Sequence, residues 1–133
     1  MYIWSTKTYQ CICTINGPSA RFRHCLYNID NERVAAGADG EFFIVNVIKG
    51  FIENKIKLPK IGVTYDFLKL QGDVLMGAGN YGKYVLYNLN TKELVEIQSE
   101  HKDIISDLVR VNENTIATCS NDHSIRIYKE EKL

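Results

Sequence analysis

Short hydrophobic runs separated by Gly, Asn and Asp recur along the whole chain, and they predict an all-β fold. Most runs alternate apolar with polar residues or are apolar throughout, and helical periodicity is weak everywhere. The Asp39-Gly40 pair between two runs is a strong signal for a tight hairpin turn. The pattern predicts strands at 2–4, 10–15, 22–29, 33–38, 41–46, 51–58, 63–70, 74–79, 83–88, 94–98, 104–111, 115–120 and 124–129.

These strands recur at a nearly constant interval along the chain. Corresponding strands of successive units contain Trp4, Val45, Tyr87 and Tyr128, and neighbours in this series are almost equally spaced. The interval lies within the ~40–45 residues that a four-stranded blade of a β-propeller typically occupies. Two spacings inside the unit are also the same in three units. His101 precedes Ser120 and Tyr128 by the same numbers of residues by which Lys60 precedes Gly79 and Tyr87. Pro18 precedes Gly37 and Val45 by these numbers as well.

The last unit carries a His, a Ser, a turn Asp and a closing aromatic residue, at His101, Ser120, Asp122 and Tyr128. In these positions the chain resembles the WD-repeat β-propeller family. The resemblance implies that the four side chains form a buried hydrogen-bonded network that locks one blade. Glu100 stands where the family usually has Gly, and Tyr128 stands where it usually has Trp.

The two earlier units lack this network. Their residues at the four positions are Lys60, Gly79, Tyr81 and Tyr87 in one unit, and Pro18, Gly37, Asp39 and Val45 in the other. We therefore expect these units to depend on strand pairing and apolar packing, and we expect the last unit to be the most rigid.

The resemblance implies a partial propeller of about three four-stranded antiparallel blades. Residues 1–17 would end one blade, 18–59 and 60–100 would form two blades, and 101–133 would form a final blade lacking its outer strand. We expect such a chain to be the C-terminal part of a larger propeller or a truncated gene product. Its missing blades would come from upstream sequence or from self-association, since both ends would expose apolar faces.

Composition narrows the function classes. The 133 residues are 45% hydrophobic and 24% charged, and 16 Lys and Arg balance 16 Asp and Glu. The zero net charge and the lack of a basic stripe argue against nucleic-acid binding. No run of apolar residues is long enough to predict a membrane span. The four cysteines show no paired C-x-x-C spacing and the N-terminus lacks signal-peptide features, which predicts reduced thiols and an intracellular protein, cytoplasmic or nuclear.

Catalytic, metal and cofactor sites have little support in the sequence. The glycine-rich segment 77–82 is not followed by a Gly-Lys-Ser/Thr motif or a helix, so it does not predict a phosphate loop. Cys11 and Cys13 could both bind one metal ion, but a metal site needs more ligands than these two. His24 is expected on an inner strand and His123 in an exposed turn. We predict no catalytic residues, no metal and no cofactor.

The function predicted is that of a non-catalytic scaffold that binds proteins or peptides through its loops. By resemblance, partner-binding positions are Arg21, Arg23 and Ala38 in the first full unit, Val63, Tyr65 and Asn80 in the second, and Ile104, Ser106 and Asn121 in the third. Two alternatives remain open at this point. One is the substrate-recognition part of a ubiquitin ligase or a similar complex, and the other is a propeller enzyme or small-molecule binder that uses a central channel.

Overall fold

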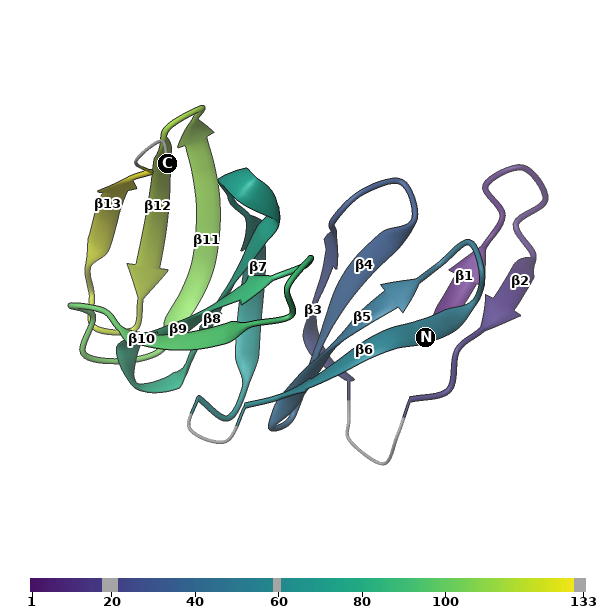
Figure 1. Ribbon diagram of the computed structural model, residues 1–133, viewed down its shortest axis with the longest axis horizontal. Coiled ribbons are helices and arrows are strands. Elements are labelled where there is room, and N and C mark those ends of the chain that lie inside the picture. Colours follow the sequence, from purple (N-terminus) through teal and green to yellow (C-terminus); the bar gives the residue numbers. More distant parts are fainter. Residues whose placement is uncertain (18–21, 59–60, 131–133) are drawn as a thin grey trace.

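The computed structural model describes residues 1–17, 22–58 and 61–130, and these fold into thirteen β-strands in four antiparallel sheets (Figure 1). The first sheet pairs β1 (Tyr2–Trp4) with β2 (Cys11–Thr14). The other three are β3 (Phe22–Asn28), β4 (Arg33–Ala38), β5 (Glu41–Asn46) and β6 (Phe51–Lys57); β7 (Thr64–Lys69), β8 (Val74–Gly79), β9 (Lys83–Asn88) and β10 (Leu94–Gln98); and β11 (Ile105–Asn112), β12 (Thr115–Ser120) and β13 (Ile125–Lys129).

The all-β prediction is confirmed, and each strand lies within one or two residues of its predicted bounds. Two short 3-10 turns, η1 (Gln71–Asp73) and η2 (Asn80–Gly82), join β7 to β8 and β8 to β9. Within each sheet, every strand is hydrogen-bonded to the next strand in the chain. The predicted hairpin at Asp39-Gly40 is present, and Gly40 adopts the left-handed conformation that the tight turn requires, with φ 73°.

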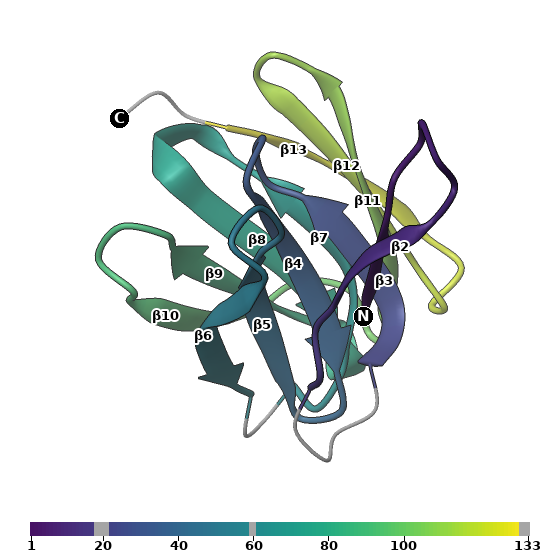
Figure 2. The same ribbon diagram turned by 90° about the vertical axis from the view of Figure 1, so that its right-hand side faces the viewer.

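The four sheets follow one another along the molecule in chain order (Figure 1). The first strands of the three larger sheets lie next to one another, β3 against β7 and β7 against β11. The β1–β2 hairpin and the β11–β13 sheet lie at opposite ends of the long axis, as Figure 2 also shows by placing β1–β2 in front of the other sheets.

The largest apolar cluster lies between the second and third sheets. Phe42 of β5 contacts Phe67 of β7 and Tyr87 of β9, with ring centroids 5.2 and 5.6 Å apart. The Phe42–Tyr87 pair is edge-to-face and the Phe42–Phe67 pair is tilted, and aromatic rings favour such arrangements over a face-to-face stack. These rings join two sheets that share no backbone hydrogen bonds between named strands.

Two smaller clusters join the remaining sheets. Ile3 and Cys13 of the first hairpin pack against Phe43 and Val45 of β5. Residues of the third and fourth sheets form the other cluster: Leu68, Met76, Ala78, Ile105, Leu108 and Ile116. Because the second sheet is covered on both faces, every residue of β5 is buried. Continuous rather than alternating apolar runs are the expected signature of such strands.

Close backbone packing explains one glycine that the repeat comparison leaves without a role. A Cβ at Gly79 would lie 2.5 Å from the carbonyl oxygen of Val63 and closer still to a side-chain carbon of Ile61. A Cβ atom does not approach other heavy atoms this closely in folded proteins, so the site has no room for a side chain. Gly79 is therefore more than a substitute for the Ser that stands at Ser120 in the last unit.

We predict that Gly79→Ser, which restores the last unit's residue at this position, destabilises the protein. Forcing a side chain into this site should cost about 1–3 kcal/mol through displaced backbone and side chains. Gly72→Ala is the control, because Gly72 has φ 69° but open space around its Cα, so its cost should be near 1 kcal/mol. Urea unfolding measures both, and a Gly79→Ser variant as stable as the wild type would contradict the packing.

Candidate functional site

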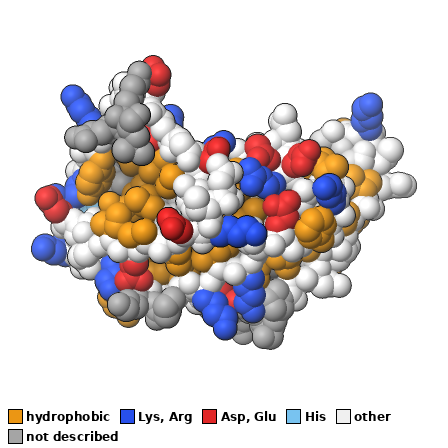
Figure 3. Space-filling view, viewed as in Figure 1, with side chains coloured by type: hydrophobic (Ala, Val, Ile, Leu, Met, Phe, Trp, Pro, Cys, Tyr) orange, Lys and Arg blue, Asp and Glu red, His pale blue; other side chains and the backbone are white. Residues whose placement is uncertain are grey.

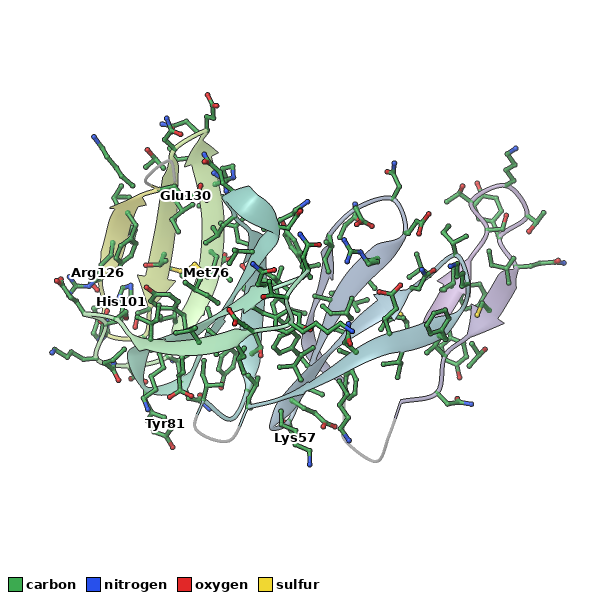
Figure 4. All side chains as sticks on the ribbon, viewed as in Figure 1. Lys57, Met76, Tyr81, His101, Arg126 and Glu130 are labelled. Carbon is green, nitrogen blue, oxygen red and sulfur yellow. The ribbon has the colours of Figure 1, made fainter. Side chains whose placement is uncertain are left out.

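The buried histidine of the last sheet lies at the centre of a hydrogen-bonded network. His101 precedes β11, and its side chain is fully buried (Figure 4). Its Nδ1 lies 3.0 Å from Oδ2 of Asp122, and its Nε2 lies 2.7 Å from the hydroxyl oxygen of Thr118. An ionised carboxylate can only accept, so Nδ1 carries the proton and donates to Asp122. Nε2 then accepts from the Thr118 hydroxyl, which assigns the tautomer.

Asp122 organises the turn between β12 and β13. Its carboxylate accepts from the Ser124 hydroxyl at 2.5 Å and from the backbone amides of Ser124 and Lys102 at 2.9 Å each. The Ser124 hydroxyl is the main cause that holds the pKa of Asp122 well below its ordinary value, and the Lys102 amide and His101 act in the same direction. A depressed carboxyl pKa means that this stabilisation is present at neutral pH and is lost as the pH falls below about 4.

The structure brings together only part of the network expected from the resemblance. His101 and Asp122 are bonded as expected, but Thr118 takes the place expected for Ser120. Ser120 instead accepts from the Asp122 amide at 3.1 Å and donates to the Asp103 carbonyl at 3.2 Å. Among the described residues, the buried hydroxyl of Tyr128 has no hydrogen-bond partner, so Tyr128 contributes packing only.

We predict that Thr118→Val lowers the free energy of unfolding by about 1–3 kcal/mol. The substitution preserves shape but leaves the buried Nε2 of His101 without a donor. Thr115→Val, in the same strand, is the matched control, since the Thr115 hydroxyl makes no hydrogen bond within the described part of the chain. Thermal and urea unfolding compare the two variants, and equal losses would show that the His101–Thr118 bond contributes nothing specific.

The Thr118–His101–Asp122 order has the form of a catalytic triad, and the threonine and histidine side chains are almost entirely buried. Thr118 is 2% exposed and the His101 side chain is fully buried. The Thr118 side chain lies between two sheets, where it also lines a cavity, and its hydroxyl donates to the imidazole. The geometry therefore orients a loop and a turn: it holds the segment before β11 against the turn that leads into β13.

A cavity of about 180 Å³ lies beside Tyr128, between the third and fourth sheets. Its walls are mainly apolar and include Met76, Tyr84 and Leu86 from the third sheet and Ile116 from the fourth. Burial, followed by the neighbouring Tyr128 phenol, raises the pKa of the Tyr84 hydroxyl. Figure 3 shows hydrophobic side chains gathered on the side of the molecule where these two sheets meet.

A pair of carboxyl groups, which the sequence analysis did not single out, joins β7 to β11. The backbone amide of Leu108 donates to Asp66 at 2.8 Å and to Asp107 at 3.0 Å. Burial and then the neighbouring Asp107 raise the pKa of Asp66 to about 6. The repeat spacing could have found the pair, because Asp66 and Asp107 occupy equivalent positions in successive units, and His24 occupies that position in the unit before.

We predict that Asp66→Asn stabilises the protein at pH 7 and removes a pH dependence between about pH 4 and 6. Because the folded pKa of Asp66 is raised, the folded state binds the proton more tightly, so wild-type stability falls as the pH rises through this window. The gain at pH 7 should be about 1 kcal/mol, after allowance for the partial exposure of the pair.

The control for this substitution is Asp103→Asn. The Asp103 carboxylate also accepts the amide of the following residue, at 2.7 Å, but it lies on the exposed loop before β11. This variant should keep the wild-type pH profile. Urea unfolding at several pH values measures both variants, and a wild-type profile for Asp66→Asn would contradict carboxylate repulsion at this contact.

The described positions predicted to bind partners lie along one edge of the molecule, which we call the loop edge: residues 38–41, 61–65, 79–83, 99–106 and 120–125. These connections lie along the lower side in Figure 1, and Figure 4 places Tyr81 on the same side. Val63, Tyr65, Asn80 and Ile104 are partly buried there, whereas Ser106 and Asn121 are exposed. Arg21 and the side chain of Arg23 lie outside the described residues.

Hydrogen bonds constrain several of these positions. The Tyr65 hydroxyl donates to the side-chain amide oxygen of Asn80 at 3.1 Å, and the backbone N–H of Asn121 donates to the Ile104 carbonyl at 3.0 Å. Ala38, also predicted to contact a partner, is fully buried in a cluster with residues of β5, so its side chain is not exposed at this edge. Side-chain alternation places it on a covered face, which the spacing to a turn residue could not indicate.

Neither of the comparisons with known proteins identifies a relative: no family model and no curated protein matches the chain.

Within the described residues, no group of three or more His, Cys, Asp and Glu side chains could hold a metal ion. Cys13 packs into the core beneath the first hairpin, whereas Cys11 is exposed. No helix in the described part of the chain has the length and apolar character to cross a membrane.

Proposed function

We propose that the protein is a non-catalytic scaffold that binds other proteins or peptides along its loop edge, in the manner of WD-repeat propellers. The observation that supports this proposal best is the bracing of loops from different sheets against one another. Partner-binding residues are commonly carried by loops that a rigid scaffold positions. Bracing between sheets supplies that rigidity at this edge.

Two contacts brace the loops across sheet boundaries. At the boundary between the second and third sheets, the Gly40 amide donates to the Gly62 carbonyl, and Asp39 forms a β-bridge with Val63. At the boundary between the third and fourth sheets, the Ser99 hydroxyl donates to the Gly82 carbonyl at 2.5 Å and accepts from the His101 amide at 3.0 Å. The loop edge is thus a continuous surface whose parts have fixed relative positions.

The chemistry of this edge suits recognition of a polar peptide. Tyr65 and Asn80 present a phenol and an amide that are already oriented by their mutual hydrogen bond, which limits the entropy lost on binding. Tyr and Arg are enriched at the centres of protein interfaces. The arginines at positions 21 and 23 are close in sequence to this edge and would suit an acidic or phosphorylated segment.

We predict that the double substitution Arg23→Ala and Tyr65→Ala reduces partner capture at least tenfold, as expected when interface anchors are truncated. The matched control is Lys49→Ala with Phe51→Ala, a cation and an aromatic residue at the turn between β5 and β6, on the opposite edge. Affinity capture with quantitative mass spectrometry compares the wild type and both variants. Proteins retained equally by all three, or lost equally from both variants, would contradict recognition by the loop edge.

A further inference from the structure

The boundary between the third and fourth sheets has smaller side chains than the boundary before it. By the repeat spacing, Leu108 corresponds to Phe67, and Ser99 corresponds to Leu58. Phe67 and Leu58 are both buried in the large cluster between the second and third sheets. Leucine and serine fill less volume at the equivalent places, which accounts for the cavity that Ser99 lines between the third and fourth sheets.

This cavity has the size and the lining of a site for a small aromatic molecule. Its volume of about 180 Å³ exceeds the ~150 Å³ of an engineered apolar cavity that binds benzene. Met76, which Figure 4 labels, contributes to the apolar wall together with Leu86 and Ile116. Tyr84 and Leu86 of the same wall are only half-buried, so the cavity is within reach of solvent and of a dissolved ligand.

One polar group of the wall has no partner among the described residues. Tyr128 lines the cavity, and its hydroxyl oxygen is buried and makes no hydrogen bond within the described part of the chain. A buried hydroxyl without a partner costs free energy, which a ligand bonded to it would recover. The Tyr84 phenol lies in the same wall and stays neutral, since burial raises its pKa. The cavity therefore offers neutral hydroxyl groups at a mainly apolar surface.

The charged residues beside the cavity favour a neutral ligand. Glu130 lines the cavity, but both of its carboxylate oxygens already accept hydrogen bonds. One accepts from the backbone amide of Gln71 at 2.7 Å, and the other accepts from the Arg110 guanidinium at 2.8 Å. Lys129 also lines the cavity, but it is an exposed residue. A charged ligand would lose its hydration here without gaining a buried partner of opposite charge.

We propose that this cavity binds a small neutral aromatic molecule with one hydrogen-bonding group, of the phenol class. The ring would pack against Met76, Leu86 and Ile116, and the polar atom would pair with the Tyr128 hydroxyl. This inference does not rest on partner recognition by the loop edge, because the cavity lies between two sheets. A bound ligand would fill the contact between these sheets and stabilise the folded chain by mass action.

The test is an NMR titration of the full chain with isotope-labelled methionine methyl groups. The chain has two methionines: Met76 lies in the cavity wall, and Met1 packs against the cluster beneath the first hairpin. Phenol and toluene are the probes, because they have nearly the same shape and differ in the hydroxyl group. Each probe should shift the Met76 methyl signal saturably and leave the Met1 signal unchanged.

The variant Tyr128→Phe separates the polar contact from the apolar one. It keeps the ring and removes the hydroxyl, so it should weaken phenol binding about fivefold, as expected for one lost hydrogen bond, and leave toluene binding unchanged. Tyr87→Phe is the matched control, since Tyr87 is the equivalent tyrosine of the preceding unit and does not line the cavity. This variant should bind both probes as the wild type does.

A filling variant checks the location of the site. Leu86→Trp enlarges a half-buried wall residue and should abolish binding of both probes. The proposal would be overturned by a Met76 signal that neither probe shifts, by equal shifts at Met1 and Met76, or by a Tyr128→Phe variant that affects both probes alike. Binding retained by a folded Leu86→Trp would also overturn it. If Leu86→Trp unfolds, the comparison of Tyr128→Phe with Tyr87→Phe still decides the outcome.

Discussion

The packing of one sheet on the next is the constraint on which the rest of the structure depends. Neighbouring sheets share almost no backbone hydrogen bonds, so side chains such as Phe42, Phe67 and Tyr87 must join them. Burial of apolar surface is not directional, and it stabilises each sheet only where a neighbour covers it. This dependence explains why β5 is buried along its whole length while β13 has an alternating pattern. It also explains why the ends of the row differ in character from its middle.

The sequence predicted the strands well because their signal is local. Apolar runs and turn residues such as Asp39 and Gly40 act within a few positions, and the regular repeat interval places each strand in its unit. Contacts between units were beyond this kind of reasoning. The bridge from Asp39 to Val63 and the steric requirement for Gly79 depend on how one sheet lies against the next. No pattern within a single unit encodes that placement.

The candidate site was predicted in part for a similar reason. The spacing of His101 and Asp122 brings both to one end of the last sheet, and they are bonded. Thr118 and Ser120 are separated by a single residue on the same strand, so alternation places both on one face and cannot choose between them. Burial of the side chain determines which hydroxyl bonds to His101. Thr118 is buried next to the imidazole, whereas Ser120 lies at the strand end, where it forms hydrogen bonds with the turn and with the Asp103 carbonyl.

In the last two units, the loop before the inner strand contacts the end of the second strand in different ways. In the last unit, polar side chains around His101 connect the loop before the inner strand to the turn after the second strand. In the preceding unit, Gly79 allows the Val63 carbonyl to approach the backbone directly, with no side chain between them. The two units contact each other at Gly82, where a Cβ would overlap the His101 carbonyl oxygen. The buried histidine is thus more than an internal feature of its own sheet, because its backbone fixes the spacing to the neighbouring one.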